Sequence, residues 1–286
     1  MAASTAALSG ITKQYKDFAL GPVDMTVPAG SIVGLIGENG AGKTTLLKIL
    51  CGVNRADDGT VDLLGGSPAD AATRAKIGVV FEDAFFYGSF TAAQVARSLA
   101  GMYGARWNAD SFSAHLRRFG LDAGKKLKEY SRGMRLKLSL AAALAHDPEL
   151  LVLDEATAGL DPVVRGELLD LFLEFIQDER HSIVMSSHIT ADLEQIADSI
   201  AYLHNGQLLF QENKDDLLQE YGVLHCGEDV LTSLPAGLVV FTRRGAYGCE
   251  SLVRERRTVQ ELLPEAVCDA ARLDDIMRFY SGRDAQ

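Results

Sequence analysis

The chain has 286 residues, 47% of them hydrophobic, which suffices for one large globular domain and a small one. Its formal net charge of −11 at pH 7 argues against a nucleic-acid-binding surface and against an electrostatic grip on anionic lipid. The longest apolar stretch, residues 138–145, is too short to span a bilayer, and the N-terminus lacks the pattern of a secretory signal. Cys51, Cys226, Cys249 and Cys268 show neither metal-ligand spacing nor a paired framework, so we interpret them as free thiols in a reducing compartment.

The first elements predicted along the chain are strands. Residues 8–27 predict alternating strands, with Gly21 and Pro22 as turn residues. Residues 31–36 form a short apolar run rich in β-branched side chains, which indicates a buried strand. A glycine-rich turn separates this strand from residues 43–50, whose apolar positions recur with the period of a helix.

This turn has the sequence of a phosphate-binding loop: Gly37, Glu38, Asn39, Gly40, Ala41, Gly42, Lys43 and Thr44, with Thr45 next. Its glycines let backbone amides point inward, where these amides and the positive end of the helix dipole suit a polyanion. Lys43 can reach the β- and γ-phosphates of a nucleotide, the Thr44 hydroxyl can ligate Mg²⁺, and Thr45 is counted with the nucleotide-binding residues. The alternative is an accidental match, against which the position between a strand and a helix argues.

An aromatic cluster follows the next two predicted strands, which lie near residues 59–64 and 77–81. The cluster comprises Phe85, Phe86, Tyr87 and Phe90, directly after Glu82, and residues 91 to about 144 are predominantly helical in pattern. Such rings suit an anchor for another protein, and the alternative is that they fill the core of the helical segment. We expect some rings to do each.

Two adjacent carboxylates, Asp154 and Glu155, end a second predicted buried strand at residues 150–153. Such a strand would deliver both to the edge of the sheet where ligands bind in α/β folds. One carboxylate can hold Mg²⁺ through water, and the next can orient or deprotonate an attacking water. The alternative is that two acids merely end a strand, but their position downstream of a phosphate loop favours catalysis.

The elements after this strand alternate between helices and strands. They are a helix at 162–177 with proline in its first turn, a strand at 183–185, a helix at 191–197, and strands at 200–204 and 207–210. Asn205 and Gly206, between the last two strands, predict a tight hairpin.

The C-terminal quarter, after about Asn213, carries none of these motifs. We predict a helix at 215–221, strands at 238–242 and 248–254 with Gly245 in the turn, and an amphipathic helix at 273–280. The strands can pack on the rest of the chain or form a dimer or regulatory surface, and the same holds for the last helix. We favour packing on the chain for the strands and an interface for the helix.

Three further motifs occur in order: Tyr130, Ser131, Arg132, Gly133 and Met134; Ala158, Gly159, Leu160 and Asp161; and His188. Together with the phosphate loop, the Asp154–Glu155 strand and Tyr15, they resemble the motifs of ATP-binding-cassette (ABC) ATPases, in which the first of the three is called the signature, the second the D-loop and the third the switch histidine. The resemblance implies an α/β P-loop ATPase fold with a central mixed sheet, an antiparallel β-subdomain and a helical subdomain. It places the ATP-binding domain at residues 1–212, the helical subdomain at about 84–146, and a small α+β accessory domain at 213–286.

The resemblance also implies partners for the chain. ABC ATPases pair head to tail with ATP between two subunits, so a second ATPase subunit is expected. Ser131 and Gly133 would meet the γ-phosphate held by the phosphate loop of that subunit, and Asp161 would cross the interface near the same loop.

Catalytic roles follow from the same resemblance. Tyr15 would stack on adenine, and Thr44 and Asp154 would hold Mg²⁺. Glu155 would act as the base, with His188 holding the γ-phosphate and the attacking water.

Two positions depart from the family pattern. Glu82 stands where most members have glutamine, and we hypothesise that its carboxylate contacts the metal and raises the Mg²⁺ demand of the reaction. The signature carries Arg132 and Met134 in place of the usual residues; Arg132 can add charge near the phosphate or face solvent, and we favour solvent.

The order of the C-terminal elements, the acid at position 82 and the aromatic cluster resemble the ATPase subunits of bacterial antibiotic and peptide exporters. We therefore expect a cytoplasmic ATPase, held at the inner face of the membrane by a separate integral-membrane permease that exports a peptide, antibiotic or lipid-like compound. The alternatives are a subunit for nutrient import, a soluble ABC ATPase that does not serve transport, and a small-molecule kinase. The sequence does not identify the cargo.

Overall fold

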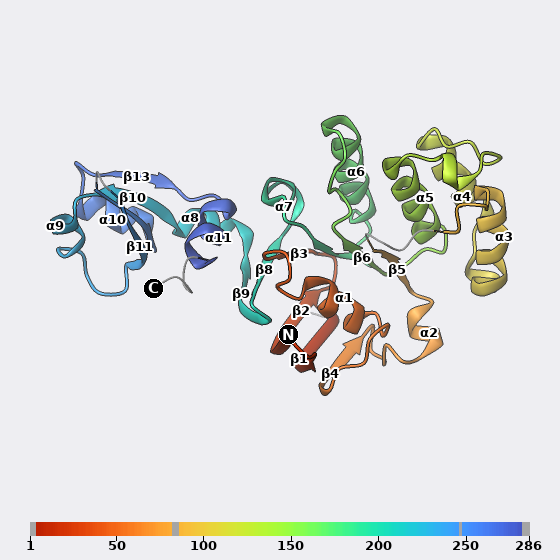
Figure 1. Ribbon diagram of the computed structural model, residues 1–286, viewed down its shortest axis with the longest axis horizontal. Helices are drawn as coiled ribbons and strands as arrows, with labels where there is room; N and C mark the ends of the chain where they lie inside the picture. Colours follow the sequence, from red (N-terminus) through yellow and green to blue (C-terminus); the bar gives the residue numbers. More distant parts are fainter. Residues whose placement is uncertain (1–3, 82–85, 246–247, 282–286) are drawn as a thin grey trace.

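The computed structural model describes residues 4–81, 86–245 and 248–281, and its strands form three sheets (Figure 1). The N-terminal sheet is antiparallel, has the order β2-β1-β4, and consists of β1 (Ser4–Gln14), β2 (Ala19–Pro28) and β4 (Asp58–Leu63). Alternate side chains of β2, among them Val23, Met25 and Val27, are buried, because successive side chains of a strand point to opposite faces. They share a core with Leu46 and Leu47 of the first helix.

The central sheet has six strands in the order β5-β6-β7-β3-β8-β9. Its members are β3 (Ile32–Ile36), β5 (Ile77–Val80), β6 (Leu150–Asp154), β7 (Ser182–Ser186), β8 (Ser199–His204) and β9 (Gln207–Asn213). The pairs are parallel except for β8 and β9, which form the predicted hairpin. Asn205 and Gly206 both have positive φ, 46° and 79°, as a two-residue turn between twisted strands requires.

The predicted turn at Gly21 and Pro22 is wrong, because both residues lie inside β2. The chain reverses earlier, where the Tyr15 amide donates a 2.8 Å hydrogen bond to the Phe18 carbonyl. Pro22 is tolerated because β2 is an edge strand of its sheet. The Gly21 amide donates to the Gly206 carbonyl at 2.7 Å and so joins β2 to the β8-β9 hairpin.

Helices cover the central sheet and extend beyond one of its edges (Figure 1). They are α1 (Lys43–Leu50), α2 (Ala71–Arg74), α3 (Ala92–Tyr103), α4 (Ala109–Arg118), α5 (Arg132–Leu144), α6 (Pro162–Phe175) and α7 (Thr190–Ile196), with short 3₁₀ turns at Gly104–Arg106 and Leu127–Glu129. Helices α3, α4 and α5 share a core of their own beside β5, as the helical pattern predicts. In the described part of the chain, no helix is long and apolar enough to cross a bilayer.

The aromatic cluster is partly buried in the helical segment, and its anchor role stays a prediction. Phe86 and Phe90 pack against the core of α3, α4 and α5, whereas Tyr87 is 78% exposed. Phe85 lies outside the described residues.

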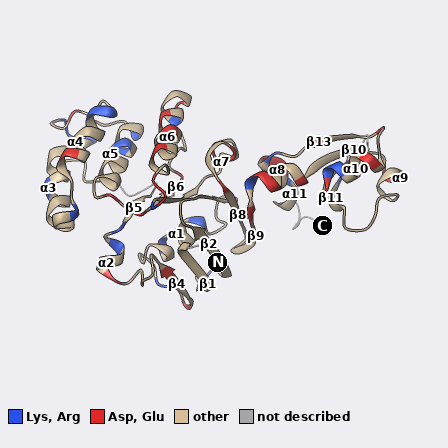
Figure 2. Cartoon of the chain, turned by 180° about the vertical axis from the view of Figure 1, so that it is seen from behind, with Lys and Arg blue, Asp and Glu red and all other residues tan. Residues whose placement is uncertain are grey.

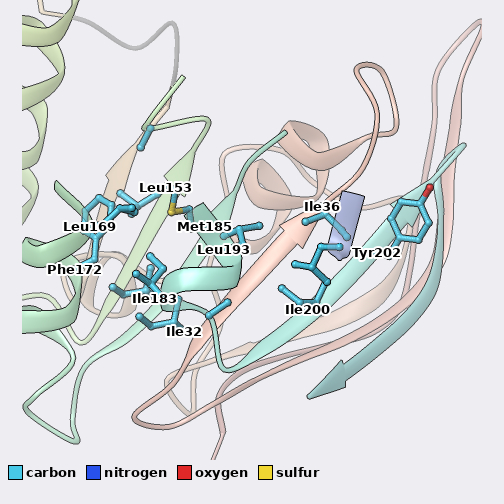
Figure 3. Packing of buried hydrophobic residues seen from close by; sticks show 14 of the residues in the cluster. Ile32, Ile36, Leu153, Leu169, Phe172, Ile183, Met185, Leu193, Ile200 and Tyr202 are labelled. Carbon is cyan, nitrogen blue, oxygen red and sulfur yellow. The ribbon is translucent and has the colours of Figure 1, made fainter. Parts of the chain in front are cut away.

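The core of the central sheet is continuous from α6 to β8 (Figure 3). Leu169 and Phe172 of α6 pack on Leu153, Ile183 and Met185, and farther along the sheet Leu193 of α7 covers Ile32 and Ile200. Strands β3, β6 and β7 are buried at every position because helices or another sheet cover both of their faces.

The C-terminal quarter forms an antiparallel sheet of its own, with the order β11-β12-β10-β13. It contains β10 (Gly222–Cys226), β11 (Val239–Gly245), β12 (Gly248–Val253) and β13 (Val267–Ala270), with helices α8 (Lys214–Glu220), α9 (Glu228–Leu231), α10 (Arg256–Leu262) and α11 (Leu273–Ser281). The sequence predicted the hairpin of β11 and β12 but missed β10 and β13, which have only five and four residues.

The expectation that the last helix forms an interface is wrong. Its apolar stripe, Leu273, Ile276, Phe279 and Tyr280, is buried in the same core as Tyr202 of β8. An apolar face on a short helix must be covered, and here α7, β11 and β12 cover it together with the rings of Tyr202 and Phe210 of the central sheet.

Candidate active site

The phosphate loop runs from the carboxyl end of β3 into the first turn of α1. Lys43 opens this helix and is only 6% exposed. Its amine donates to the Gly37 carbonyl at 2.7 Å and lies 3.3 Å from Glu155 Oε1. The loop therefore brings a buried cation and the amides of a helix N-terminus to one place, which is the arrangement that binds phosphate.

Two glycines of the loop are required by their surroundings. Gly42 has φ 106°, and a Cβ there would lie 2.7 Å from Cζ of Phe18. A Cβ on Gly37 would lie 2.2 Å from the Leu203 carbonyl oxygen. A side chain at either position would push the loop away from its neighbours, so the glycines keep the loop against β8 and the aromatic ring.

Asp154, at the end of β6, is 2% exposed and is held at both carboxylate oxygens. The Thr44 hydroxyl donates to Oδ2 at 2.7 Å, and the Ser186 hydroxyl donates to Oδ1 at 2.6 Å. A hydroxyl and a carboxylate are hard oxygen donors of the kind that Mg²⁺ takes, usually with waters and phosphate oxygens completing its shell. Among the described residues no group of three or more His, Cys, Asp or Glu lies together as a metal cage.

Glu155 occupies a strained position beside this pair. Its φ is 53°, a left-handed conformation that non-glycine residues rarely adopt and that often marks functional sites. The amide of Glu155 donates to Ser186, at 3.1 Å to the carbonyl oxygen and 3.0 Å to the hydroxyl. These bonds turn the side chain out of the strand direction and toward Lys43.

His188 completes a chain of charged and polar groups. Its Nδ1 lies 2.6 Å from Glu155 Oε2, and its amide donates to the same oxygen at 3.3 Å. The ring nitrogen and the backbone amide of His188 thus meet the same carboxylate oxygen. Lys43, Glu155 and His188, which are far apart in the sequence, thus form one contiguous set.

A cavity of about 230 Å³ lies over the phosphate loop and Glu155. Its lining consists of Phe18, Glu38, Asn39, Gly40, Gly42, Lys43, Thr44, Thr45 and Glu155. Ala41 of the same loop is buried and does not line the cavity. Ligand pockets usually measure about 300–1,000 Å³, so this cavity is small for a whole nucleotide.

The aromatic residue at the cavity is Phe18, whereas the sequence pointed to Tyr15. Tyr15 is 41% exposed, its hydroxyl accepts a bond from Asn54 at 3.3 Å, and it does not line the cavity. The two rings lie 6.4 Å apart. The signal for Phe18 was present, since it is an aromatic residue at the start of the strand that passes over the phosphate loop.

The signature and D-loop residues lie side by side, away from the cavity. Ser131 caps α5 by accepting from the Met134 amide at 3.2 Å, and Asp161 caps α6 by accepting from the Val164 amide at 3.0 Å. A Cβ on Gly133 would lie 3.4 Å from Leu160. None of the three predicted contacts, Ser131, Gly133 and Asp161, lines the phosphate-loop cavity of its own chain.

Arg132 is exposed, as expected, but its guanidinium also lies against the D-loop, 3.2 Å from where a Cβ on Gly159 would be. Glu82, the predicted metal contact, lies outside the described residues.

Cys51, just beyond α1, is buried, and burial together with the nearby Asp154 charge raises the pKa of its thiol to about 12. It is therefore a core residue and not a nucleophile.

Comparison with known proteins agrees with this geometry. A profile described as ABC transporter matches residues 20–158. An uncharacterised ABC transporter ATP-binding protein of Synechocystis is 38% identical over 207 residues, which are 70% of this chain and 58% of that protein. The bacitracin transport ATP-binding protein BcrA of Enterococcus faecalis is 35% identical over 72% of this chain and 68% of its own length. The lantibiotic transport ATP-binding protein SrtF of Streptococcus pyogenes is 33% identical, over 73% and 90%.

Solved structures show the same fold. The ATP-binding subunit of an ABC transporter superposes with a TM-score of 0.68 at 28% identity, over 75% of this chain and 92% of that one. The cassette MJ0796, solved as a dimer bound to ADP and phosphate, gives a TM-score of 0.66 at 23% identity, over 73% and 98%.

A phosphate loop after one strand of a parallel sheet, with an acidic pair ending a nearby strand, defines a P-loop nucleoside triphosphatase. The comparisons narrow this class to one family. The chain belongs to the ABC transporter family, and its fold is that of the ATP-binding cassette, as the motifs predicted.

Proposed function

We propose that this chain is the ATP-hydrolysing subunit of a transporter and that it powers a separate integral-membrane permease. The observation that carries the proposal is the contact set of Glu155, whose carboxylate lies 2.6 Å from His188 Nδ1 and 3.3 Å from the Lys43 amine. A carboxylate held between a phosphate-binding lysine and an imidazole is placed to take a proton from water attacking the γ-phosphate.

The other residues of the site bind and orient. Lys43 and the amides of the phosphate loop would hold the β- and γ-phosphates, and Thr44 and Asp154 would hold Mg²⁺. When bound there, Mg²⁺ supplies positive charge that neutralises the phosphate oxygens. His188 would orient the γ-phosphate and the water, while Ser186 keeps Asp154 and the Glu155 backbone in place. Glu82 remains a proposed further contact to the metal.

We further propose a head-to-tail dimer with a second ATPase subunit. The small cavity and the separation of Ser131, Gly133 and Asp161 from it both support two half-sites, each completed across an interface. Ser131 begins α5, so the positive end of this helix would add to the attraction for the γ-phosphate. The cassette MJ0796, solved as a dimer bound to ADP and phosphate, supports the pairing of two such chains.

The named relatives support the choice of cargo. BcrA and SrtF are described as transport proteins for bacitracin and a lantibiotic, so we propose that the permease exports a peptide, antibiotic or lipid-like compound. Import of a nutrient is the alternative. We place the chain in the cytoplasm, at the inner face of the membrane through the permease, with no nucleic-acid partner. Lysine and arginine are interspersed with acids along the chain and α8 is acidic (Figure 2), which supports the last point.

We keep the division into an ATP-binding domain at 1–212, with its helical subdomain at about 84–146, and an accessory domain at 213–286. The C-terminal sheet has a small core of its own, which includes Leu224, Val253 and Val259, and this supports the boundary.

The test of the proposed activity is the variant Glu155→Gln. It should bind ATP, lose nearly all turnover and form an ATP-dependent dimer that light scattering detects. Turnover like that of the parent would show that Glu155 is not the base. Mass spectrometry of proteins that co-purify from gently solubilised membranes tests the transport reading: a stoichiometric polytopic protein supports it, and recovery with soluble partners alone contradicts it.

A further inference from the structure

Two hydrogen bonds join α11, the last helix of the C-terminal quarter, to α7, the helix that follows His188. Helix α7 begins at Thr190, two residues after the histidine. The Thr190 hydroxyl, in a side chain only 5% exposed, donates to Asp274 Oδ1 of α11 at 2.8 Å. The Leu273 amide, at the start of α11, donates to Glu194 Oε1 of α7 at 2.8 Å. Each helix thus donates one hydrogen bond to the other, α7 through the hydroxyl of its first residue, Thr190, and α11 through the amide of its first residue, Leu273.

Apolar packing reinforces these bonds. Leu193 and Ile196 of α7 are buried in the same core as Leu273 and Ile276 of α11. Leu193 points from α7 into the central sheet (Figure 3), and α11 packs beside α7, where its Tyr280 ring also lies 5.8 Å from the Tyr202 ring of β8. A displacement of α11 cannot leave α7 unmoved, because packed cores are close to incompressible.

The opposite flank of α7 is tied to the D-loop helix. Asp192 is 4% exposed, and its Oδ1 lies 3.5 Å from Arg165 of α6. Helix α6 begins directly after Asp161, its N-cap. Helix α7 is thus held between the D-loop helix and the C-terminal helix, and the residue that precedes it by two positions is the partner of Glu155.

We infer that α11 is a positioning element for the catalytic reaction: Asp274, acting through Thr190, fixes the start of α7 and hence the place of the His188 imidazole against Glu155. This inference rests on the role proposed above for His188. Two residues of chain span at most about 7 Å, so a shift at Thr190 reaches the imidazole with little slack. Misplacement of a catalytic group by about 1 Å can slow a reaction by about a hundredfold.

Through α11, the C-terminal quarter of the chain takes part in positioning the catalytic groups. A ligand or protein that moves this quarter of the chain would change the rate of ATP hydrolysis without touching the nucleotide. The effect would be on kcat, because Lys43 and the phosphate loop lie on other elements and would keep their affinity for ATP.

The experiment compares Asp274→Ala and Thr190→Val with two matched controls in the full chain. Thr190→Ser keeps the hydroxyl. Ser281→Ala removes a different hydrogen bond of α11, the 3.2 Å contact to the Tyr202 hydroxyl of β8, and leaves α7 alone. We expect Asp274→Ala and Thr190→Val to lower kcat by about threefold to tenfold, the effect of one lost hydrogen bond, with unchanged KM for ATP. Thr190→Ser and Ser281→Ala should retain the parent kcat.

A second measurement asks whether Asp274 acts through His188. In a His188→Ala background, Asp274→Ala should cause no further loss, because the group that it positions is gone. An additive loss overturns the inference. A second contradicting result is a Thr190→Val variant that melts below the parent but has the same kcat as Ser281→Ala. The contact between Thr190 and Asp274 would then stabilise the fold without affecting the reaction. The single variant His188→Ala tests the proposed role of His188 separately. If it hydrolyses ATP like the parent, that role is contradicted whatever the result for Asp274.

Discussion

Strand β7 contains two buried serines whose comparison separates stability from catalysis. Ser182 begins the strand and Ser186 ends it, and both are fully buried. At about 3.3 Å per residue the two side chains are roughly 13 Å apart. Ser182 accepts from the Gly30 amide at 3.1 Å and shares a 2.7 Å hydrogen bond with the Thr5 hydroxyl, away from the site. Ser186 donates to Asp154 at 2.6 Å and accepts from the Glu155 amide at 3.0 Å.

Replacing either serine by alanine should destabilise the fold. Ser182→Ala removes bonds between neutral groups, which contribute about 1–2 kcal/mol. Ser186→Ala removes a bond to a carboxylate, which contributes about 1.5–3 kcal/mol, and leaves one oxygen of Asp154 buried without its partner. At about 2 °C per kcal/mol for a chain of this size, we expect each variant to melt roughly 2–6 °C below the parent.

Only Ser186→Ala should impair the reaction. Ser186 orients the carboxylate that we assign to Mg²⁺, and loss of such a supporting bond typically lowers metal affinity or activity by about 10–100-fold. Steady-state hydrolysis over a Mg²⁺ titration, with calorimetric melting of the same samples, measures both effects. Equal turnover for Ser182→Ala and Ser186→Ala would refute the assignment of Asp154 and Ser186 to the metal site.

Three further predictions concern separate features. Phe18→Ala should raise the Kd for ATP by about tenfold, since stacking of a base on an aromatic ring contributes about 1–3 kcal/mol, whereas Tyr15→Ala should raise it less; titration calorimetry decides, and the reverse order would return the adenine contact to Tyr15. Lys43→Ala should lose ATP affinity in the same assay, and retention of affinity would contradict its role at the phosphates. Burial lowers the pKa of His146 below its usual value; the unfolded chain then binds the extra proton, so stability should fall as pH drops below about 6.5, and His146→Gln should show a weaker loss between pH 7.5 and 5.5 than the parent.

Several short motifs with local geometry were predicted correctly, although the turn at Gly21 and Pro22 was not. The phosphate loop, the hairpin at Asn205 and Gly206, and the acidic pair that ends a strand each depend on a few consecutive residues. Backbone preferences act over such distances, so the residue types alone determine the local shape. The family followed from these motifs, because their order along the chain is itself a sequence property.

Contacts between distant segments were decided by the tertiary structure. The sequence named Glu155 and His188, but their 2.6 Å contact exists only because β6 and β7 pair in the sheet. Ser186 was not anticipated, since a serine at the end of a strand has no pattern of its own. Phe18 replaces Tyr15 at the cavity because of where the β1-β2 turn falls over the phosphate loop.

The C-terminal quarter shows the same division most clearly. The spacing of its apolar residues predicted the amphipathic helix. Such spacing indicates that one face of the helix is covered but does not indicate which element covers it. Tertiary packing supplied the answer by placing Leu273 and Ile276 against α7 and the central sheet, and Asp274 against Thr190. The sequence by itself thus determined the motifs, the family and the residues able to do the chemistry. Only the fold determined which of them meet, because side chains 84 residues apart, such as Thr190 and Asp274, are brought together by packing and not by local preference.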